Sequence, residues 1–581
     1  MCLLVVLGAL IFFPAVRAPL FLDDFLHGAM VEGSYPVPRG PFDLYDFIGD
    51  DNRALLLDRG FLPWWTEKHL TVRFFRPLAS ALLYVEHRVF SHAALPMHLH
   101  SFAWWIGAIL AARALFRRTL ADRPARIATV IFALAPCHAL PIAWLANRAT
   151  LIALTLGTVG LVLYAQWRQE RRVRHALLGG ALFVLAFLGG GEYALAFGGY
   201  VVAIEAVRRK ETLLRRASGL LPFIVPAIGY LAWRRAGGYG SRGSGFYTDP
   251  LQDAGAFLAD APMRAASLLG ASWLTLDIGW WRSGGIAEWF LVAILLGSAI
   301  VLVPLIRRML VRLPEPNRRS ATWLLFGSLL ALLPSLAVAP GARVLGASML
   351  GVAPIVSLFL DRIWFPSEDT EAEAPSRFGQ LAPLVAVALG FAHLIHGPGS
   401  AFLSARAQRE SAVDFATRID VIRSQVEDAA HSELGVIRGL ASVFFMPFAI
   451  DLRSPPPPRW FVLAHTSHVL ALRRDERTID LVAPADTALY PMSERSLYRS
   501  PRARLRKGDE IRISGLRVKI LEASALGPRI ARFVFDQDPT SIPWASDDYE
   551  ELRRVKLPDV GFGDIFDARP LNASPTAPAH E

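Results

Sequence analysis

Long runs of apolar residues alternate with short polar segments along the first 400 residues of the chain. An apolar run of about 17 to 25 residues can cross the hydrocarbon core of a bilayer as a helix. The runs predict an α-helical polytopic membrane protein with about eleven spans, two of them short, over residues 1–400. The predicted spans lie near residues 3–16, 95–115, 127–143, 149–167, 175–190, 194–207, 217–233, 286–307, 321–339, 344–364 and 380–397.

The pattern changes after residue 400. Residues 401–454 mix charged and apolar positions in the manner of a solvated amphipathic helix, and we read them as an extracytoplasmic helical linker. Beyond four consecutive prolines, short runs alternate with a period of two and are separated by turn residues. The sequence therefore predicts a small, mainly β, soluble extracytoplasmic domain at 455–569 and a disordered tail at 570–581.

The composition agrees with a membrane protein and excludes several other classes. Of the 581 residues, 53% are hydrophobic and 19% are charged, which is more apolar than a usual soluble domain. The net charge of +10 comes mostly from arginines between the apolar runs. Because the chain has no zinc-finger spacing, P-loop or dinucleotide-binding motif, we expect no nucleic-acid partner. The two cysteines, Cys2 and Cys137, lie in apolar runs and offer no disulfide framework.

The arginines predict which helix ends face the cytoplasm. Cytoplasmic loops are rich in Lys and Arg, so four strongly basic segments are assigned to the inside. Keeping residues 168–174 and 208–216 both on the cytoplasmic side requires the chain between them to cross the membrane and return. Two short helices that meet at residues 189–192 satisfy this, and one long helix does not. The four basic segments are residues 113–126, 168–174, 208–216 and 307–319.

The outer side then receives the loops between the remaining span ends. These are a first loop at 17–92, in which residues 76–91 read as a helix lying on the membrane surface, the turn at Asn147, the loop 234–285, and everything after residue 398. The topology predicts an integral protein of a bacterial inner membrane, with a cytoplasmic N-terminus and a periplasmic or otherwise extracytoplasmic C-terminal domain.

An acidic pair, Asp23 and Asp24, follows the first predicted span. The long side chains of Lys and Arg can extend from the membrane boundary to place their charge in water, but the short side chain of Asp cannot. Two adjacent carboxylates also repel each other. Two interpretations remain open from spacing alone. The pair is either the solvated end of a helix or a catalytic base at the membrane surface.

Further polar and ionisable side chains gather near the predicted outer ends of the spans. Charges this close to hydrocarbon are costly and mark function more often than in soluble proteins. Each has a simpler alternative, such as an interfacial anchor, a helix cap or, for a histidine soon after Pro136, a partner for backbone carbonyls freed by the proline. The residues are Arg76, His98, His100, His138, Arg148, Glu192 and Arg343.

The order of these residues resembles that of the GT-C superfamily of polytopic glycosyltransferases. Within it, the chain is most similar to protein O-mannosyltransferase-like enzymes, including the transmembrane O-mannosyltransferases that carry tetratricopeptide repeats. The resemblance covers roughly residues 1–400. The motifs, after the acidic pair, are FRPL at 75–78, MHLHSFAWW at 97–105, PCHALPIAWLANR at 136–148, LGGGEYAL at 188–195 and PGARVLGASMLG at 340–351.

The resemblance implies an inverting transfer of a sugar from a polyprenyl-phosphate donor to an unknown acceptor, which is a protein, a lipid or a polysaccharide. It implies no nucleotide, no other cofactor and no essential catalytic metal. Such a reaction needs a base for the acceptor proton and cations for the departing phosphate. Asp23, or failing it Asp24, is the expected base. Donor phosphate and sugar contacts are expected from Arg76, His98, His138, Arg148, Glu192 and Arg343.

The chain departs from the family pattern at several positions. Ser101 stands where the family has Asn, Trp104 and Trp105 fill a His position, and Gly191 replaces the Lys of a Lys-Glu hairpin. Residues 149–150 replace an acid, and the β-domain stands in place of the repeats. Two alternatives therefore stay open, a transporter or flippase of a lipid-linked or anionic substrate, and a catalytically degenerate GT-C scaffold used in cell-envelope assembly. The lack of a detectable inverted repeat and the one-sided charges count against transport.

Overall fold

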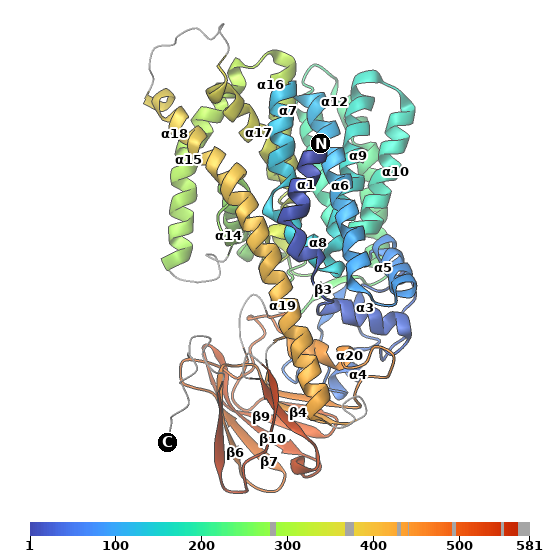
Figure 1. Ribbon diagram of the computed structural model, residues 1–581, viewed down its shortest axis with the longest axis vertical. Coiled ribbons are helices and arrows are strands. Elements are labelled where there is room, and N and C mark those ends of the chain that lie inside the picture. The colour runs from blue at the N-terminus through green and yellow to red at the C-terminus, as the bar shows by residue number, and fades with distance from the viewer. Residues whose placement is uncertain are drawn as a thin grey trace. The chain divides into compact units, whose positions relative to one another are not determined.

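The computed structural model describes residues 1–278, 286–366, 377–426, 432–439, 441–490, 496–547 and 551–567 (Figure 1). The predicted tail at 570–581 lies outside the described residues. The chain forms two compact units. The helical unit consists of Met1–Ala18, Phe74–Tyr239 and Asp249–Glu410, and the β unit consists of Pro19–Arg73, Gly240–Thr248 and Ser411–Glu581.

The helical unit is built almost entirely from helices joined by short turns. One further helix, α19 (Gly397–Gln425), belongs in part to each unit. The α-helices are α1 (Cys2–Ile11), α2 (Phe13–Val16), α5 (Pro77–Phe90), α6 (Ala94–Thr119), α7 (Asp122–Ala133), α8 (Ala139–Ala143), α9 (Arg148–Glu170), α10 (Val173–Gly190), α11 (Ala196–Ala206), α12 (Leu213–Gly219), α13 (Leu221–Ala236), α14 (Ala254–Leu274), α15 (Ile286–Arg312), α16 (Glu315–Leu330), α17 (Gly346–Trp364) and α18 (Arg377–Phe391). Single turns are η1 (Pro136–His138), η2 (Leu145–Asn147), η3 (Gly191–Leu195), η5 (Pro334–Ala337), η6 (Ala342–Val344) and the π-helical η7 (Ala392–His396).

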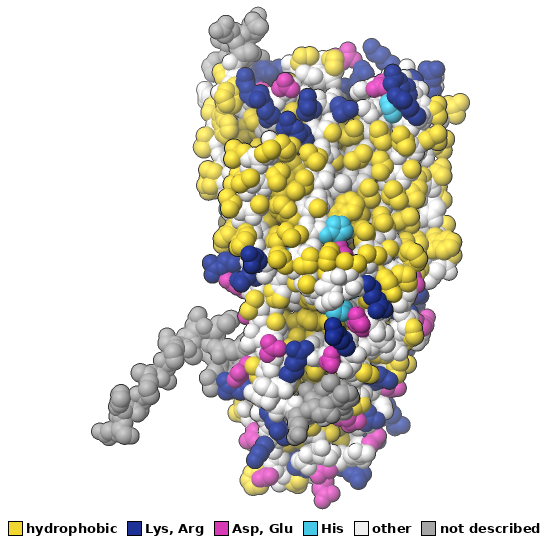
Figure 2. All heavy atoms as spheres, turned by 45° about the vertical axis from the view of Figure 1, so that its right-hand side comes forward, with side chains coloured by type: hydrophobic (Ala, Val, Ile, Leu, Met, Phe, Trp, Pro, Cys, Tyr) yellow, Lys and Arg dark blue, Asp and Glu magenta, His cyan; other side chains and the backbone are white. Residues whose placement is uncertain are grey.

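The helices confirm a membrane protein with fewer candidate spans than the sequence predicted. Within the described residues, seven helices are long and apolar enough to cross a membrane, or eight if α7 and α8, bent by 44°, form one broken span. The predicted count of eleven is not reached, in part because the runs at 3–16 and 217–233 form short helices, α1 with 10 residues and α13 with 16. Figure 2 shows a broad hydrophobic belt over the helices on the face that it draws, bordered by Lys and Arg side chains.

The chain reverses between α10 and α11, as the arginine placement predicted. Gly190, at the end of α10, packs against Ala153 near the start of α9, so these two helices are antiparallel. Phe197 of α11 contacts Gly157 of α9, and Glu205 near the end of α11 pairs with Arg168 near the end of α9. Helix α11 therefore runs parallel to α9 and antiparallel to α10. The 34-residue apolar stretch Val173–Ala206, counted above as one candidate span, is therefore a pair of antiparallel helices joined by η3.

Among the described residues, the β unit contains three sheets, which confirms the predicted β-rich C-terminal region. The largest sheet has six strands in the order β13-β6-β7-β10-β9-β8, with all pairs antiparallel. A four-stranded mixed sheet has the order β12-β11-β4-β5, and a small sheet has the order β1-β2-β3. The strands are β1 (Asp46–Ile48), β2 (Thr71–Arg73), β3 (Gly240–Arg242), β4 (Leu434–Arg438), β5 (Trp460–Ala464), β6 (His468–Arg473), β7 (Thr478–Val482), β8 (Glu510–Ile513), β9 (Leu516–Ser524), β10 (Gly527–Phe535), β11 (Trp544–Asp547), β12 (Leu552–Val555) and β13 (Gly563–Asp567). Short helices are α3 (Asp23–Glu32), α4 (Arg53–Asp58), η8 (Ala441–Phe445), α20 (Met446–Ala449) and η9 (Pro539–Ser541).

The first long loop of the chain is part of the β unit. The amide of Glu67 donates to the carbonyl of Tyr498 at 2.8 Å, and the amide of Trp460 donates to the carbonyl of Arg59 at 2.8 Å. The guanidinium of Arg499 also donates to backbone carbonyls of the first loop, including that of Thr66 at 3.1 Å. Backbone hydrogen bonds of this kind join segments more than 400 residues apart. The predicted domain ranges stay a prediction, and the compact units divide the chain differently at residues 19–73.

Candidate functional site

In the β unit, the acidic pair begins α3 directly after a strained residue. Leu22 has φ 45° and ψ −107°, a conformation that costs a bulky L-residue about 1–3 kcal/mol. Asp24 is fully buried, and its Oδ2 accepts a hydrogen bond from the amide of Phe21 at 3.0 Å. Asp23 is half-buried, and burial of the Tyr498 hydroxyl, together with the charge of Asp23, raises the pKa of that hydroxyl. Asp24 therefore holds the start of its own helix, and Asp23 is the more accessible carboxylate.

In the helical unit, Arg148 lies at the start of α9 and is almost completely buried. Its Nε donates to Ser101 Oγ at 2.8 Å, its Nη2 donates to the carbonyl of Met97 at 2.9 Å, and its Nη1 donates to Glu86 Oε1. His100 Nδ1 contacts the same carboxylate oxygen. Arg148 thus ties α5, α6 and α9 together. Ser101 supplies an acceptor to this arginine where the family resemblance has Asn.

Glu86 is the counter-charge in this cluster, which the sequence did not identify. Burial would raise its pKa, but the hydrogen bonds from His100 and Arg148 and the charge of Arg148 lower it below its usual value. Trp104 Nε1 donates to His100 Nε2 at 2.9 Å, so the other ring nitrogen carries the proton that faces Glu86. Glu86 is one of the charged residues in the segment 76–91, which the sequence analysis interpreted as a helix on the membrane surface.

A second cluster surrounds the turn between α10 and α11. Gly191 has φ 60° and ψ −134°, where L side chains are strained. A Cβ added there would lie 3.0 Å from Tyr230 Oη and 3.3 Å from Arg76 Nε. Glu192 Oε1 accepts from Arg234 Nε at 2.5 Å. The Arg76 guanidinium stacks over the Phe74 ring at 4.6 Å. The turn therefore brings the Arg-Pro motif and the hairpin glutamate together from segments more than 100 residues apart.

Arg234 completes this second cluster, and the sequence did not single it out. Besides Glu192, it pairs with Asp249. Burial would lower its pKa, but the two carboxylates raise it. The two ion pairs hold Glu192 and Asp249 on one buried guanidinium. Arg234 stands at the start of the loop predicted at 234–285, and the sequence assigned it no role.

The two histidines of the predicted site bond to backbone carbonyls. His98 Nδ1 lies 2.9 Å from the carbonyl oxygen of Ile142, and His138 Nε2 lies 2.9 Å from that of Phe132. Both rings are buried. Arg343 is half-buried in η6, which lies against η1. The segments that carry His138 and Arg343 are therefore neighbours in the helical unit.

The predicted site residues fall into both units. Six of them, from Arg76 to Arg343, belong to the helical unit, whereas Asp23 and Asp24 belong to the β unit. That all eight serve one reaction stays a prediction. Within the residues that the structure describes, no group of three or more His, Cys, Asp or Glu side chains is placed to hold a metal ion. Metal independence likewise stays a prediction.

Comparison with known proteins finds similarity in fold only. No protein-family model and no curated protein matches the sequence. The structure is similar to the apo form of the Archaeoglobus fulgidus oligosaccharyltransferase, with 13% identity, 78% of this chain and 64% of that chain covered, and a TM-score of 0.41. It is also similar to ArnT from Cupriavidus metallidurans bound to undecaprenyl phosphate, with 13% identity, 78% and 85% coverage, and a TM-score of 0.40.

A further structure of the archaeal enzyme, AglB from Archaeoglobus fulgidus in complex with an inhibitory peptide and a dolichol-phosphate, shares 14% identity at a TM-score of 0.40, with 78% of this chain and 64% of that chain covered. The chain thus spans 64% of the length of the archaeal oligosaccharyltransferase. These neighbours are GT-C membrane glycosyltransferases. The likeness is remote, and we transfer no residue role from it.

Proposed function

We propose that the chain is a membrane glycosyltransferase of the protein O-mannosyltransferase-like GT-C type. It transfers a sugar with inversion from a polyprenyl-phosphate donor to an acceptor on the extracytoplasmic face of a bacterial inner membrane. The observation that carries the proposal is the meeting of Arg76 with the Gly191–Glu192 turn. These residues belong to two motifs that the family resemblance assigns to donor binding.

The same contact accounts for the missing hairpin lysine. A side chain at position 191 would begin 3.3 Å from Arg76 Nε, in a backbone conformation that suits glycine. Arg76 therefore supplies a cation beside Glu192 where the family has a lysine. A guanidinium binds two phosphate oxygens at once, which an ammonium does not. The departure from the family pattern is thus compatible with donor binding.

The proposed chemistry needs one base and cations that accept a phosphate. The Asp23 carboxylate takes the proton of the acceptor hydroxyl, with Asp24 as the second candidate. The acceptor oxygen bonds to the anomeric carbon as the bond from that carbon to the phosphate oxygen breaks. Polyprenyl phosphate leaves with the bonding electrons. Arg76 and Arg343 neutralise the charge that develops on it.

The remaining predicted residues take supporting roles. Arg148 already donates to Glu86, Ser101 and a backbone carbonyl, so it acts as a positioning residue that fixes α5 and α6. Glu192 orients the neighbouring cations. His98 and His138 support the donor site through the carbonyls that they bind.

Release of polyprenyl phosphate from a radiolabelled polyprenyl-phosphate sugar tests the proposal. The purified full-length protein is given the donor with a membrane extract as acceptor, and wild type is compared with Asp23→Asn. Loss of a general base lowers the rate by about 10²–10⁴-fold. The matched control is Asp50→Asn, which changes a 91% exposed carboxylate of the same unit and leaves the rate unchanged. A wild type that releases no polyprenyl phosphate with any donor rules out the enzyme, and full turnover by Asp23→Asn rules out the base.

A further inference from the structure

A pocket of about 390 Å³ lies in the helical unit at the ends of α6, α9 and α11 and the start of α16. Each of the four basic segments that the sequence assigned to one side contributes one lining arginine: Arg118, Arg168, Arg208 and Arg319. Among the described residues that line the pocket, none is an aspartate or glutamate. The pocket therefore gathers positive charge from four separate stretches of the chain.

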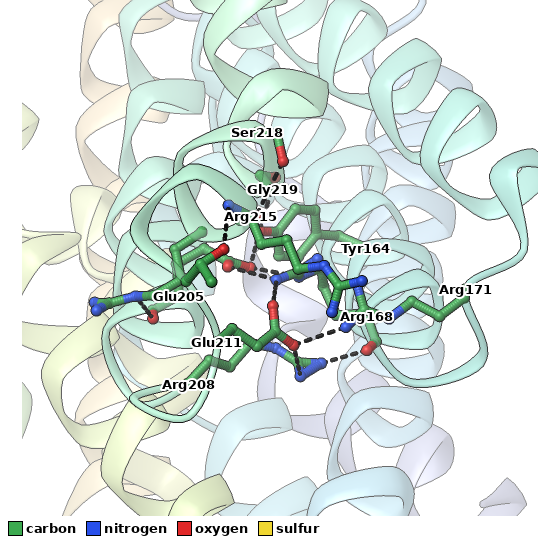
Figure 3. A network of polar contacts seen from close by, with 11 residues as sticks. Tyr164, Arg168, Arg171, Glu205, Arg208, Glu211, Arg215, Ser218 and Gly219 are labelled. Carbon is green, nitrogen blue, oxygen red and sulfur yellow. Dashed lines mark hydrogen bonds and ion pairs between the residues drawn. The ribbon is translucent and has the colours of Figure 1, made fainter.

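A buried ion network fixes one side of the pocket (Figure 3). Arg168 Nε lies 2.7 Å from Glu205 Oε1, and its Nη2 lies 2.6 Å from Glu211 Oε2. The Tyr164 hydroxyl donates to Glu205 Oε1 at 2.6 Å. Glu211 also pairs with Arg171 at 2.8 Å. These contacts neutralise Arg168 and hold the ends of α9 and α11 together at this wall of the pocket.

The other three arginines are less well neutralised. Arg208 donates to the carbonyl of Arg168 and lies 3.5 Å from Glu211 Oε1. Burial and the positive charge of Arg168 lower its pKa, so a bound anion would stabilise its charged form. Arg319 makes an exposed pair with Glu315 at 2.7 Å, and Arg118 donates to the carbonyl of Ala114 at 3.3 Å. Exposed pairs contribute little free energy, so the Arg319 guanidinium can turn toward a ligand at small cost. Arg118 donates to uncharged groups, the carbonyl of Ala114 and the amide oxygen of Gln166 at 2.6 Å.

The rest of the lining is amphipathic. Asn317, in the first turn of α16, and Ser320, in the second, add hydrogen-bond donors near a helix start, where the helix dipole also favours an anion. Ile204, Val207 and Trp323 form apolar wall. The pocket thus has a cationic end beside apolar side chains, at the termini of membrane-spanning helices. This arrangement matches the phosphate headgroup of a lipid whose acyl chains remain in the bilayer.

We propose that this pocket binds a phosphate-bearing anion at the end of the helical unit away from the candidate reaction site. Arg148 begins α9 and Arg168 lies 20 residues later, so the two lie about 30 Å apart along the helix. The pocket is thus separate from the donor contacts proposed above and does not depend on that function. Its phosphate belongs either to an anionic lipid or to a soluble phosphate, and the test below separates the two.

Native mass spectrometry of the full chain in detergent measures binding of phosphatidylglycerol, diacylglycerol and inorganic phosphate. The pocket variant carries Arg118→Gln and Arg319→Gln. The matched control carries Arg126→Gln and Arg174→Gln, which removes the same charge from exposed side chains at the same end of the helices. We expect at least 10-fold weaker phosphatidylglycerol binding in the pocket variant and no change in the control.

Each outcome decides the proposal. Phosphatidylglycerol binding that depends on Arg118 and Arg319, without binding of inorganic phosphate, identifies a lipid headgroup. Millimolar inorganic phosphate that binds with the same dependence identifies a soluble phosphate. Equal binding of phosphatidylglycerol by wild type and the pocket variant overturns the proposal. Diacylglycerol binding as tight as that of phosphatidylglycerol also overturns it, because the site would then recognise only the tails.

Discussion

His138 donates a hydrogen bond from its Nε2 to the carbonyl oxygen of Phe132 at 2.9 Å. Phe132 stands four residues before Pro136, whose missing N–H leaves that carbonyl without its usual helical donor. The amide of Ala135 reaches the same oxygen only at 3.4 Å. The histidine therefore satisfies a backbone acceptor at the 44° bend between α7 and α8. This contact is the backbone role that the sequence had left open for His138.

Replacement of His138 should lower the thermal stability of the protein rather than weaken donor binding. His138→Leu removes the donor and leaves a buried carbonyl poorly satisfied, which costs about 1–3 kcal/mol. We expect a lower Tm for the detergent-solubilised protein. His396→Leu, at an exposed histidine, is the control and should leave the Tm unchanged. An unchanged Tm for His138→Leu, combined with a raised KM for the donor, would instead assign the ring to the substrate.

The sequence could predict the elements whose pattern is local or imposed by the membrane. The hairpin of α10 and α11 followed from charge, because a basic segment must lie on one side of the bilayer or the other. The C-terminal strands followed from alternation, as in β9, where exposed Arg517 and Lys519 alternate with buried Val518 and Ile520. The alternation depends only on neighbouring residues, whereas the charge argument depends on the membrane that keeps two basic segments on one side.

Long-range pairings could not be predicted from the sequence. Strand β2, at Thr71–Arg73, pairs with β3, at Gly240–Arg242, and nothing in either tripeptide specifies the other. For the same reason the chain gave no sign that residues 19–73 join the C-terminal region. In the candidate site, Arg148 could be named, but its partner Glu86 and the pair of Arg234 with Asp249 could not, since many acids compete for each guanidinium until the fold is known.

The Arg168–Glu205 pair should be essential for the stability of the helical unit. Glu205→Gln leaves Arg168 buried with half of its counter-charge removed, and breaking a buried pair costs about 3–5 kcal/mol. We expect a marked fall in Tm. The control is Glu170→Gln, which changes a carboxylate that is 40% exposed at the end of the same α9 and should shift the Tm little. A fall in Tm of the same size in both variants would show that the buried pair contributes no more to stability than the loss of any negative charge at this end of α9.

Glu86 should make stability depend on acidic pH. Its pKa in the folded chain is lower than the ordinary value of 4.5, despite burial, because His100 and Arg148 stabilise the carboxylate. A lowered folded pKa contributes stability that is present above 4.5 and is lost as the pH falls through the folded value. We expect the Tm of wild type to fall between pH 5 and 3 more steeply than that of Glu86→Gln. Glu410→Gln, at an exposed helix pair, should follow wild type.

Gly191 should tolerate no side chain, although it replaces a lysine of the family pattern. Its φ of 60° strains any L-residue, and a Cβ would meet Tyr230 Oη at 3.0 Å and Arg76 Nε at 3.3 Å. Gly191→Ala should therefore destabilise the chain by about 1–2 kcal/mol. Gly229→Ala is the control, since a Cβ at Gly229 of α13 meets nothing within 4 Å and should be neutral or slightly stabilising.

Gly191→Ala also distinguishes a structural role of the turn from a role in donor binding. Tyr230 is packed on Phe187 and yields little, whereas the Arg76 guanidinium ends a flexible side chain and is displaced first. If Arg76 holds the donor phosphate, Gly191→Ala raises the KM for the polyprenyl-phosphate sugar at temperatures where the chain remains folded. Arg76→Lys then raises it similarly, because an ammonium cannot bind two phosphate oxygens at once. A KM that is unchanged in both variants would leave Arg76 as a packing residue of the turn and would remove the contact on which the proposed function rests.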